Sequence, residues 1–505
     1  MFLILGKPII HDGRSFSHTV PVALKSDQVT SAKIKHGMVV VSTLSGNDSN
    51  GGKSWAASLK TIQKAIDKAS AGDMIMVTNG TYSSISVPAR LEPLTIQAVG
   101  TVDKCVINGG GKRCALLGSE TTTNIYLNGF TLTGGSVSGQ NTNGAGAKFG
   151  TLNKCVITKN SAGSLCTAAG AYGCVLNDCT ISSNTASDWA GGMEKCTANR
   201  CTIKNNSGYQ GAGGAAGSIL FDCNISGNVS QYGGGGANGS TLYRCILDSN
   251  VAKGDSHDNL SGCEAHNCLI KSNYAQGRRA MEGSSCYNCT IVSTKSSQSI
   301  WRGTSLYNCI VSSSGKFTID GDNNWKVSLA NCRLNNVSLG TYVTKKGCST
   351  GDPKFVSNTD FHLQAGSPCI DNGSGTYASG NDLDLDGKPR IVNGHVDIGA
   401  YEYQPPVGSV EKVAATPRHP WNGLVDLQFT IKGDSGVKFN TSFSARDVAG
   451  GTNLTMKTLY KSNGTAANAA KEPLLPGAYN WVWNATVDLG EGVVLDRVTI
   501  SVNVQ

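Results

Sequence analysis

The most constraining feature of this sequence is a cysteine that recurs, with its neighbours, through the middle of the chain. Successive members are 20 to 24 residues apart, and an aliphatic residue stands two positions after each one. An apolar or small residue stands three positions before it, so the local pattern is that of a strand rather than a helix. The series is Cys155, Cys179, Cys201, Cys223, Cys245, Cys268, Cys289, Cys309 and Cys332.

Turn residues recur with the same period. Asparagine stands five positions after the cysteine in six successive repeats, from Asn160 to Asn273, and glycine-rich turns follow it. Asparagine tolerates left-handed backbone geometry, so we expect it to occupy the turn and to form a hydrogen-bonded ladder between coils. Short strands and recurrent turns at a period near 22 residues predict a right-handed parallel β-helix. The LxxLxL signature of a leucine-rich repeat is absent.

The repeated cysteines are interpreted as an inward-facing stack of small apolar residues that stay reduced. Parallel side chains in register point the same way, which disfavours the dihedral angle of a disulfide. Cys286 and Cys289 form a lone CxxC motif, and both fall on core positions. No zinc site is therefore predicted from the cysteines.

The two ends of the repeat region carry capping patterns. Residues 55–80 predict a short helix and then a strand, which would cover the open end of the solenoid. The apolar face of that helix would consist of Leu59, Ile62, Ile66 and Ala69. This segment resembles the N-terminal cap of bacterial pectate-lyase-like right-handed β-helix proteins. Residues 352–403 contain SPCIDNG and DIGAYEY and resemble the C-terminal signature of the choice-of-anchor Q group of such proteins.

The resemblance covers residues 38–404 and implies an extracytoplasmic bacterial β-helix protein, without implying a particular reaction. Residues 1–37 are then an N-terminal extension. Its start is too weakly apolar for a clear secretory signal, and the sequence has no apolar run long enough to span a membrane. We nevertheless expect a secreted or cell-surface protein, because the resemblance implies one.

Residues 409–505 follow a Pro405-Pro406 linker and alternate apolar with polar residues, which predicts a separate small β-sandwich. This region resembles the immunoglobulin-like modules appended to secreted bacterial proteins. Trp421, Trp481 and Trp483 could form a carbohydrate platform, although tryptophans in such modules more often fill the core or its edge.

One outward row of the solenoid is predicted to carry rings. The position two before the ladder cysteine should face solvent, and five successive repeats place a ring there. Pyranose rings could stack on these faces; alternatively, the rings stack on each other and reinforce the sheet. The predicted substrate-binding residues are Phe221, Tyr243, Tyr287 and Tyr307, with His266 completing the row.

The densest ionisable patch of this charge-poor chain falls in the same coils. Its candidate catalytic residues are Asp258, His266, Arg279, Glu282 and Arg302. β-Elimination on a uronic-acid polymer needs a cation, such as Arg302 or Arg279, and a base, such as His266. Hydrolysis would instead use a carboxylate pair such as Asp258 and Glu282. The alternative interpretation is a solvated charged turn.

Asp382, Asp384 and Asp386 alternate along the chain and end in Gly387. Calcium prefers several oxygens brought together by one tight loop, so we predict a structural Ca²⁺ site, with a simple acidic turn as the alternative. An EF-hand is excluded, because Asn393 stands where its final glutamate would be.

Charge narrows the range of partners. The net charge of +8 is spread thinly and contains no run of Lys or Arg, which argues against nucleic acid. The leading hypothesis is an extracellular polysaccharide-active protein, a lyase or a glycosidase, that binds a polysaccharide or surface glycan. The alternative is a non-catalytic adhesin or glycan-binding protein, since β-helices host both kinds of function.

Overall fold

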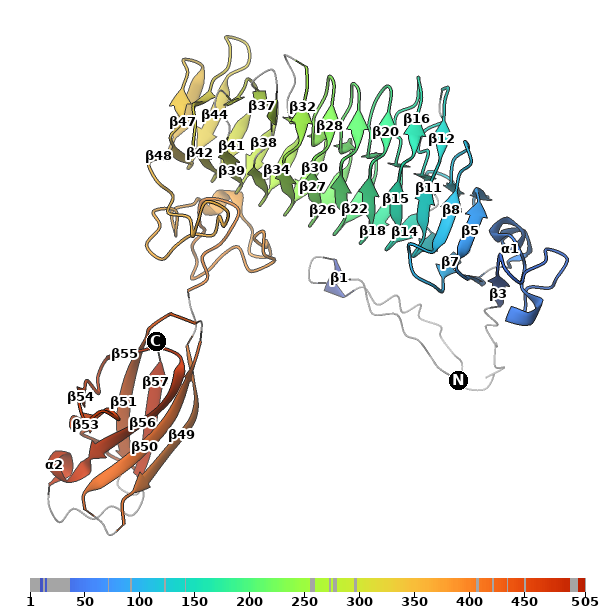
Figure 1. Ribbon diagram of the computed structural model, residues 1–505. Helices are drawn as coiled ribbons and strands as arrows, with labels where there is room; N and C mark the ends of the chain where they lie inside the picture. Colours follow the sequence, from blue (N-terminus) through green and yellow to red (C-terminus); the bar gives the residue numbers. More distant parts are fainter. Residues whose placement is uncertain are drawn as a thin grey trace, which may run out of the picture. The chain divides into compact units, whose positions relative to one another are not determined.

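The chain forms a right-handed parallel β-helix followed by a small antiparallel β-unit (Figure 1). The computed structural model describes residues 10–11, 14–15 and 37–504, except 71, 91–92, 122–123, 141, 255–258, 272–273, 276–278, 295–297, 406–407, 420–421, 434, 449–450 and 491–497. The two compact units are Met1–Tyr403 and Gln404–Gln505.

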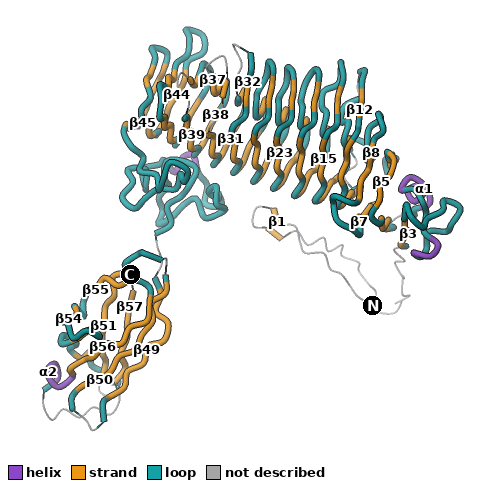
Figure 2. The backbone as a smooth tube through the Cα atoms, in the orientation of Figure 1, coloured by secondary structure: helices purple, strands orange, loops and turns teal. Residues whose placement is uncertain are grey.

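Each coil of the solenoid contributes short strands to sheets that run along its axis, joined by tight turns (Figure 2). In one coil, β18 (Val175–Asn177) lies in sheet A and β19 (Thr180–Ser182) in sheet B. Then β20 (Thr185–Ala186) lies in sheet D and β21 (Met193–Glu194) in sheet C. Among the described residues, sheets A, B, C and D contain 14, 13, 12 and 7 strands.

Sheet A carries the outward row of rings. It consists of β3 (Met38–Val41), β4 (Met74–Val77), β7 (Leu94–Ala98), β10 (Ile125–Asn128), β14 (Thr151–Asn153), β18, β22 (Thr197–Asn199), β26 (Ile219–Phe221), β30 (Thr241–Tyr243), β34 (Glu264–His266), β38 (Ser285–Tyr287), β41 (Ser305–Tyr307), β44 (Val327–Ala330) and β47 (Val343–Lys346). Sheet B runs from β5 (Gly80–Ser83) to β48 (Ser349–Thr350), sheet C from β6 (Ile85–Val87) to β46 (Ser338–Leu339), and sheet D from β12 (Ser136–Val137) to β36 (Tyr274–Ala275).

The cysteine ladder predicted from the sequence is confirmed. All nine cysteines are at most 2% exposed and carry free thiols, at the corner between sheets A and B. The thiols also accept hydrogen bonds, which the sequence did not suggest. Sγ of Cys179 accepts from the backbone N–H of Cys155 at 3.4 Å. At the corner between sheets C and A, Oγ of Ser218 accepts in the same way from the N–H of Cys196 at 3.1 Å. The ladder therefore satisfies corner amides as well as filling the core.

The asparagine ladder is also confirmed from Asn160 to Asn250, whereas Asn273 lies outside the described residues. The backbone geometry predicted for the ladder asparagines is wrong. Nδ2 of Asn184 donates to Oδ1 of Asn206 one coil on, at 3.0 Å, and both residues are fully buried. The left-handed conformation belongs to the residue before each ladder asparagine, as at Ser183 (φ 56°) and Asn205 (φ 55°). The turn thus uses one residue for its bend and leaves the next free to point its amide inward.

The N-terminal end of the solenoid is covered by a helical cap. Helix α1 (Ile62–Lys68) begins after the N-cap Thr61 and buries Ile62 and Ile66 at the first coils. Leu59, predicted on this helix, instead precedes it and forms a β-bridge with Val41.

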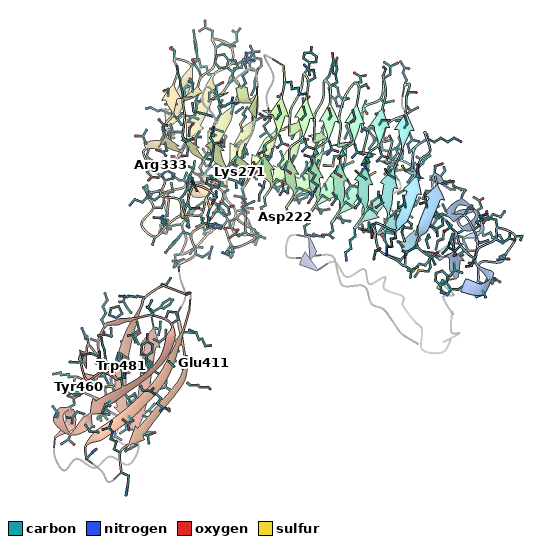
Figure 3. All side chains as sticks on the ribbon, in the orientation of Figure 1. Asp222, Lys271, Arg333, Glu411, Tyr460 and Trp481 are labelled. Atoms are coloured by element: carbon teal, nitrogen blue, oxygen red, sulfur yellow. The ribbon has the colours of Figure 1, made fainter. Side chains whose placement is uncertain are left out.

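The irregular segment 352–403, called the strap here, packs on the outer face of sheet B. Phe361, Ala400 and Tyr401 form a buried apolar cluster with Leu269 of β35 (Leu269–Lys271). Nζ of Lys271, a residue labelled in Figure 3, also lies 6.0 Å from the centroid of the Phe361 ring. The DIGAYEY motif at the end of the strap helps to dock it, since the backbone N–H of Ala400 donates to Oγ1 of Thr290 at 2.9 Å. Cys369 of the SPCIDNG motif packs in a second buried cluster with Ile310 of sheet B.

The second unit consists of two antiparallel sheets around its own core. Its strands are β49 (Ser409–Pro417), β50 (Leu424–Lys432), β51 (Phe439–Asp447), β52 (Asn453–Leu454), β53 (Leu459–Tyr460), β54 (Ala466–Ala467), β55 (Glu472–Leu474), β56 (Gly477–Asn484) and β57 (Val498–Val504), with helix α2 (Ala485–Leu489). Trp481, labelled in Figure 3, and Trp483 are each 2% exposed. They fill the core rather than a carbohydrate platform; Trp421 lies outside the described residues.

Candidate functional site

A continuous row of polar and aromatic side chains faces outward along sheet A. Parallel strand pairing keeps its members in register from one coil to the next. The row is Gln97, Asn128, Asn153, Asn177, Asn199, Phe221, Tyr243, His266, Tyr287 and Tyr307. Its first half is an amide ladder: Nδ2 of Asn177 donates to Oδ1 of Asn153 at 2.8 Å.

The second half of the row is the predicted set of rings, and these rings stack on one another. Neighbouring centroids are 4.8–5.0 Å apart, with interplanar angles of 8–14°. Tyr377 of the strap lies beside the end of this stack, with its ring centroid 4.7 Å from that of Tyr307 and 6.3 Å from that of Tyr287. Since neighbouring rings occupy the inner faces, a ligand would meet ring edges and phenol hydroxyls there. Glycan binding by the row stays a prediction.

Three of the predicted catalytic residues come together beside sheet A. Arg279 and Glu282 lie on β37 (Arg279–Glu282) of sheet C, and Arg302 follows β40 (Gln298–Ile300) one coil on. Glu282 accepts from both arginines, from Arg302 Nε at 2.6 Å and from Arg279 Nη1 at 2.9 Å. Arg302 Nη1 also lies 3.2 Å from Oδ2 of Asp322, a residue that the sequence did not single out. The hydrogen bonds to Glu282 and Asp322 raise the pKa of Arg302.

His266 does not join this cluster. Its Nε2 lies 2.9 Å from Oε1 of Glu264 on the same strand, and its ring is held between Tyr243 and Tyr287. Asp258, the predicted partner of Glu282 for hydrolysis, lies outside the described residues.

A shallow groove lies over the corner where sheet C turns into sheet A. Its volume is about 320 Å³, and its lining is Gly239, Ser240, Thr241, Gly262, Cys263, Glu264, Gly283, Ser285 and Tyr287. The glycines form its floor at φ of 57–61°, a backbone conformation that favours glycine. A Cβ at Gly239 or Gly262 would meet no atom within 4 Å. The floor is therefore open because these positions have no side chain.

Ionisable residues flank this floor. Glu264 of sheet A lines the groove, and Glu282 of sheet C directly precedes the floor residue Gly283. The sequence could have located the floor, because glycine stands six residues before the ladder cysteine in most repeats. These residues are Gly173, Gly217, Gly239, Gly262, Gly283 and Gly303.

The three carboxylates predicted to bind calcium have different partners. Asp384 is fully buried, and its carboxylate accepts the backbone N–H groups of Asp386, Lys388 and Glu402 at 2.8–3.0 Å. Asp382 accepts from Ser379, and Asp386 pairs with His362 at 3.0 Å. Among the described residues, no group of three or more His, Cys, Asp or Glu is arranged to hold a metal ion. Calcium binding stays a prediction.

Residues 44–214 match a family model described as "Protein of unknown function (DUF1565)". No curated protein matches the chain. Among solved structures, the chain is similar to pectate lyase Pel9A, with 13% identity over 73% of this chain and 96% of that one, at a TM-score of 0.36. It is also similar to a GH136 lacto-N-biosidase from Eubacterium ramulus (10% identity, 62% and 67% covered, TM-score 0.32) and to the Dettilon tailspike protein (10%, 88% and 93%, 0.27). Similarities this distant assign no activity to the chain.

Neither the solenoid cap nor the second unit contains a helix of membrane-spanning length and apolarity, nor does any other described part of the chain.

Proposed function

We propose that this protein binds a linear polysaccharide along the outside of the solenoid, over the glycine floor, and hydrolyses it. The observation that carries the proposal is the open groove at the corner of sheets C and A, with Glu264 and Glu282 beside it. Floor residues repeat once per coil, at roughly 4.8 Å, which is on the order of one sugar residue. A chain lying along the axis would therefore meet the same groove surface at each unit.

The charges at the groove favour hydrolysis over β-elimination. Elimination needs a cation that is free to neutralise a uronate carboxylate, whereas Arg302 is already paired with Glu282 and Asp322. Hydrolysis needs two carboxyl groups, one to protonate the leaving oxygen and one to act as base or nucleophile. Glu282 accepts hydrogen bonds from two arginines, which orient its carboxylate for the second role. Glu264 is then the candidate acid.

Glycan binding without cleavage is the second candidate function. Its support is that the described ionisable groups at the groove already have partners, as in the pairs Glu264–His266 and Glu282–Arg302. Such networks also serve to hold a binding surface in shape.

The test combines a panel of polysaccharides (β-glucan, xylan, galactomannan and homogalacturonan) with assays of binding, reducing ends and ultraviolet-absorbing products. Hydrolysis yields reducing ends alone, whereas elimination also yields unsaturated sugars that absorb. Glu264→Gln and Glu282→Gln should each lower turnover by about 10²-fold or more, with smaller effects on binding. Arg200→Gln, which breaks the exposed pair with Asp178 away from the groove, is the matched control.

Each outcome bears on the proposal. Products that absorb in the ultraviolet would show that the protein cleaves by elimination and not by hydrolysis. Binding without products would leave the non-catalytic function, and binding to no polysaccharide of the panel would refute both. Secretion, the choice-of-anchor Q relationship and the immunoglobulin-like character of the second unit remain predictions.

A further inference from the structure

The wall of the groove continues one coil beyond the residues that the sequence singled out. Glu282, Arg302 and Trp325 each stand seven residues before a ladder cysteine. The Trp325 side chain is the most exposed tryptophan described, at 60%. A Cβ built on Gly303 would lie 3.7 Å from Cε3 of Trp325, so the indole lies over the last floor position.

Trp325 is held in place by its backbone. Its N–H donates to Oδ1 of Asp322 at 2.8 Å, and the N–H of Gly303 donates to the carbonyl of Lys326 at 3.2 Å. Asp322 is itself paired with Arg302. These bonds fix the backbone that carries the indole, and the exposed indole presents a large apolar face beside charged groups, a combination that suits a sugar ring.

The opposite end of the floor is closed by a side chain. Lys195 occupies the floor position, with φ 51°, and its Nζ lies 5.6 Å from the centroid of the Tyr172 ring. The open floor therefore runs from Gly217 to Gly283, because a Cβ at Gly217 would meet no atom within 4 Å and one at Gly283 only Gly262, at 3.9 Å. Four coils span roughly 19 Å at about 4.8 Å each.

We infer that Trp325 is a sugar-stacking residue at one end of the groove and that Lys195 sets the other end, so that the groove holds a segment of about four sugar residues. This inference rests on the proposed function. The network around Trp325 pairs two arginines with Glu282 and Asp322, so it carries no net charge. The class of ligand is therefore a neutral glycan chain, whose hydroxyls can both donate to these carboxylates and accept from the arginines.

The test measures affinity for oligosaccharides of increasing length, prepared from each member of the panel, by titration calorimetry. For the wild type, affinity should rise with length up to about four units and then level off. Trp325→Ala should weaken binding of the tetramer by about tenfold, and Trp325→Phe should retain most of it. Trp55→Ala, which removes an exposed tryptophan of the N-terminal cap, is the control.

A second variant tests whether Lys195 sets the other end of the groove. Its readout is the oligosaccharide length at which affinity stops rising, which a general loss of stability would not lengthen. Lys195→Gly should move the levelling-off point to about one unit longer, because glycine adopts this backbone conformation readily and opens the next floor position. Equal binding by wild type and Trp325→Ala, an unmoved plateau in Lys195→Gly, or a preference for homogalacturonan oligomers would overturn the inference while leaving the proposed function standing. Failure of the wild type to bind any oligomer or polymer would refute both.

Discussion

The side-chain amide of Asn184 donates to Oδ1 of Asn206 at 3.0 Å, and the same oxygen accepts the backbone N–H of Asn184 at 3.0 Å. One side chain thus satisfies two groups of the preceding coil. Nδ2 of Asn206 in turn donates to Asn228 and to the carbonyl of Ile181, both at 2.9 Å. The ladder therefore joins successive coils through fully buried polar contacts.

Asn206→Ala should lower the free energy of unfolding by about 2–4 kcal/mol, because it leaves several buried polar groups without partners. Asn199→Ala removes an amide from the half-buried outer row, where water can replace it, and should cost under about 1 kcal/mol. Urea unfolding of both variants measures the difference. Equal losses would show that the inner ladder contributes no more than the outer one.

The ladder thiols should be unreactive until the protein unfolds, because burial leaves no path for a reagent. Of the 18 cysteines, only Cys348 is more than slightly exposed. A thiol-reactive chromophore should therefore label about one site in the native protein and all of them in denaturant. Rapid labelling of many thiols in the native state would contradict the described core.

Cys201→Ser should be tolerated better than Cys201→Val. Sγ of Cys201 accepts from the backbone N–H of Cys179 at 3.4 Å and lies 3.4 Å from the carbonyl oxygen of Leu176, to which its S–H can donate. Ser218 shows that a hydroxyl accepts an equivalent bond at the other corner. Valine would leave the amide unpaired, at a cost of about 1–3 kcal/mol. Thermal unfolding of the two variants shows which is more stable. A more stable valine variant would show that the thiol contributes through packing and not through hydrogen bonds.

Stability should fall as pH rises toward about 8, because of Glu402. Burial raises the pKa of Glu402 to about 8, although Arg390 opposes the shift, and Asp397 and Asp384 reinforce it. The folded state therefore holds this proton more tightly than the unfolded chain. Its stabilising contribution is complete below the ordinary glutamate pKa and is lost as pH rises through the folded value.

Glu402→Gln should flatten this dependence between about pH 5 and pH 8, since glutamine cannot ionise. The melting temperature of both proteins over that range provides the measurement, with Glu411→Gln on the exposed surface of the second unit as the control. An unchanged pH profile in Glu402→Gln would assign the dependence to another group.

The predicted calcium site is tested at Asp384. If the loop binds calcium, a chelator should lower the melting temperature of the wild type but not that of Asp384→Ala. The variant itself should be less stable by about 2–4 kcal/mol, because three buried N–H groups lose their acceptor. Identical wild-type melting with and without chelator would reject calcium at this loop.

The repeat made the solenoid predictable from the sequence, because a strand pattern and a turn at one period admit few folds. The burial of the cysteines and the pairing of Asn184 with Asn206 followed from register alone. The groove was not predicted. The recurrent glycine at Gly239 and Gly262 marks its floor in the sequence, but only the fold shows that these positions lie next to each other on an open surface beside ionisable groups. Trp325 was not predicted either. It stands at the same offset from a ladder cysteine as Glu282 and Arg302, but its place over Gly303 is visible only in the structure.

The strap illustrates what local patterns cannot supply. Its motifs were visible in the sequence, but their docking on Leu269 and Thr290 depends on contacts across about a hundred residues, which no periodicity encodes. The charge network was also only partly foreseen. Glu282 and Arg302 share one offset from the ladder cysteine and Arg279 is expected in a neighbouring turn, whereas Asp322 belongs to a turn that does not follow the repeat.

Strict register also makes the solenoid modular. Removing residues 201–222, from one ladder cysteine to the residue before the next, would bring Cys179 beside Cys223 and Asn184 beside Asn228 with each ladder still closed. The same excision removes Gly217 and so shortens the open floor by one coil. Duplication or loss of one such unit in the gene would thus lengthen or shorten the groove in steps of one coil. The length of the binding surface can therefore change in evolution without any change in the rest of the fold.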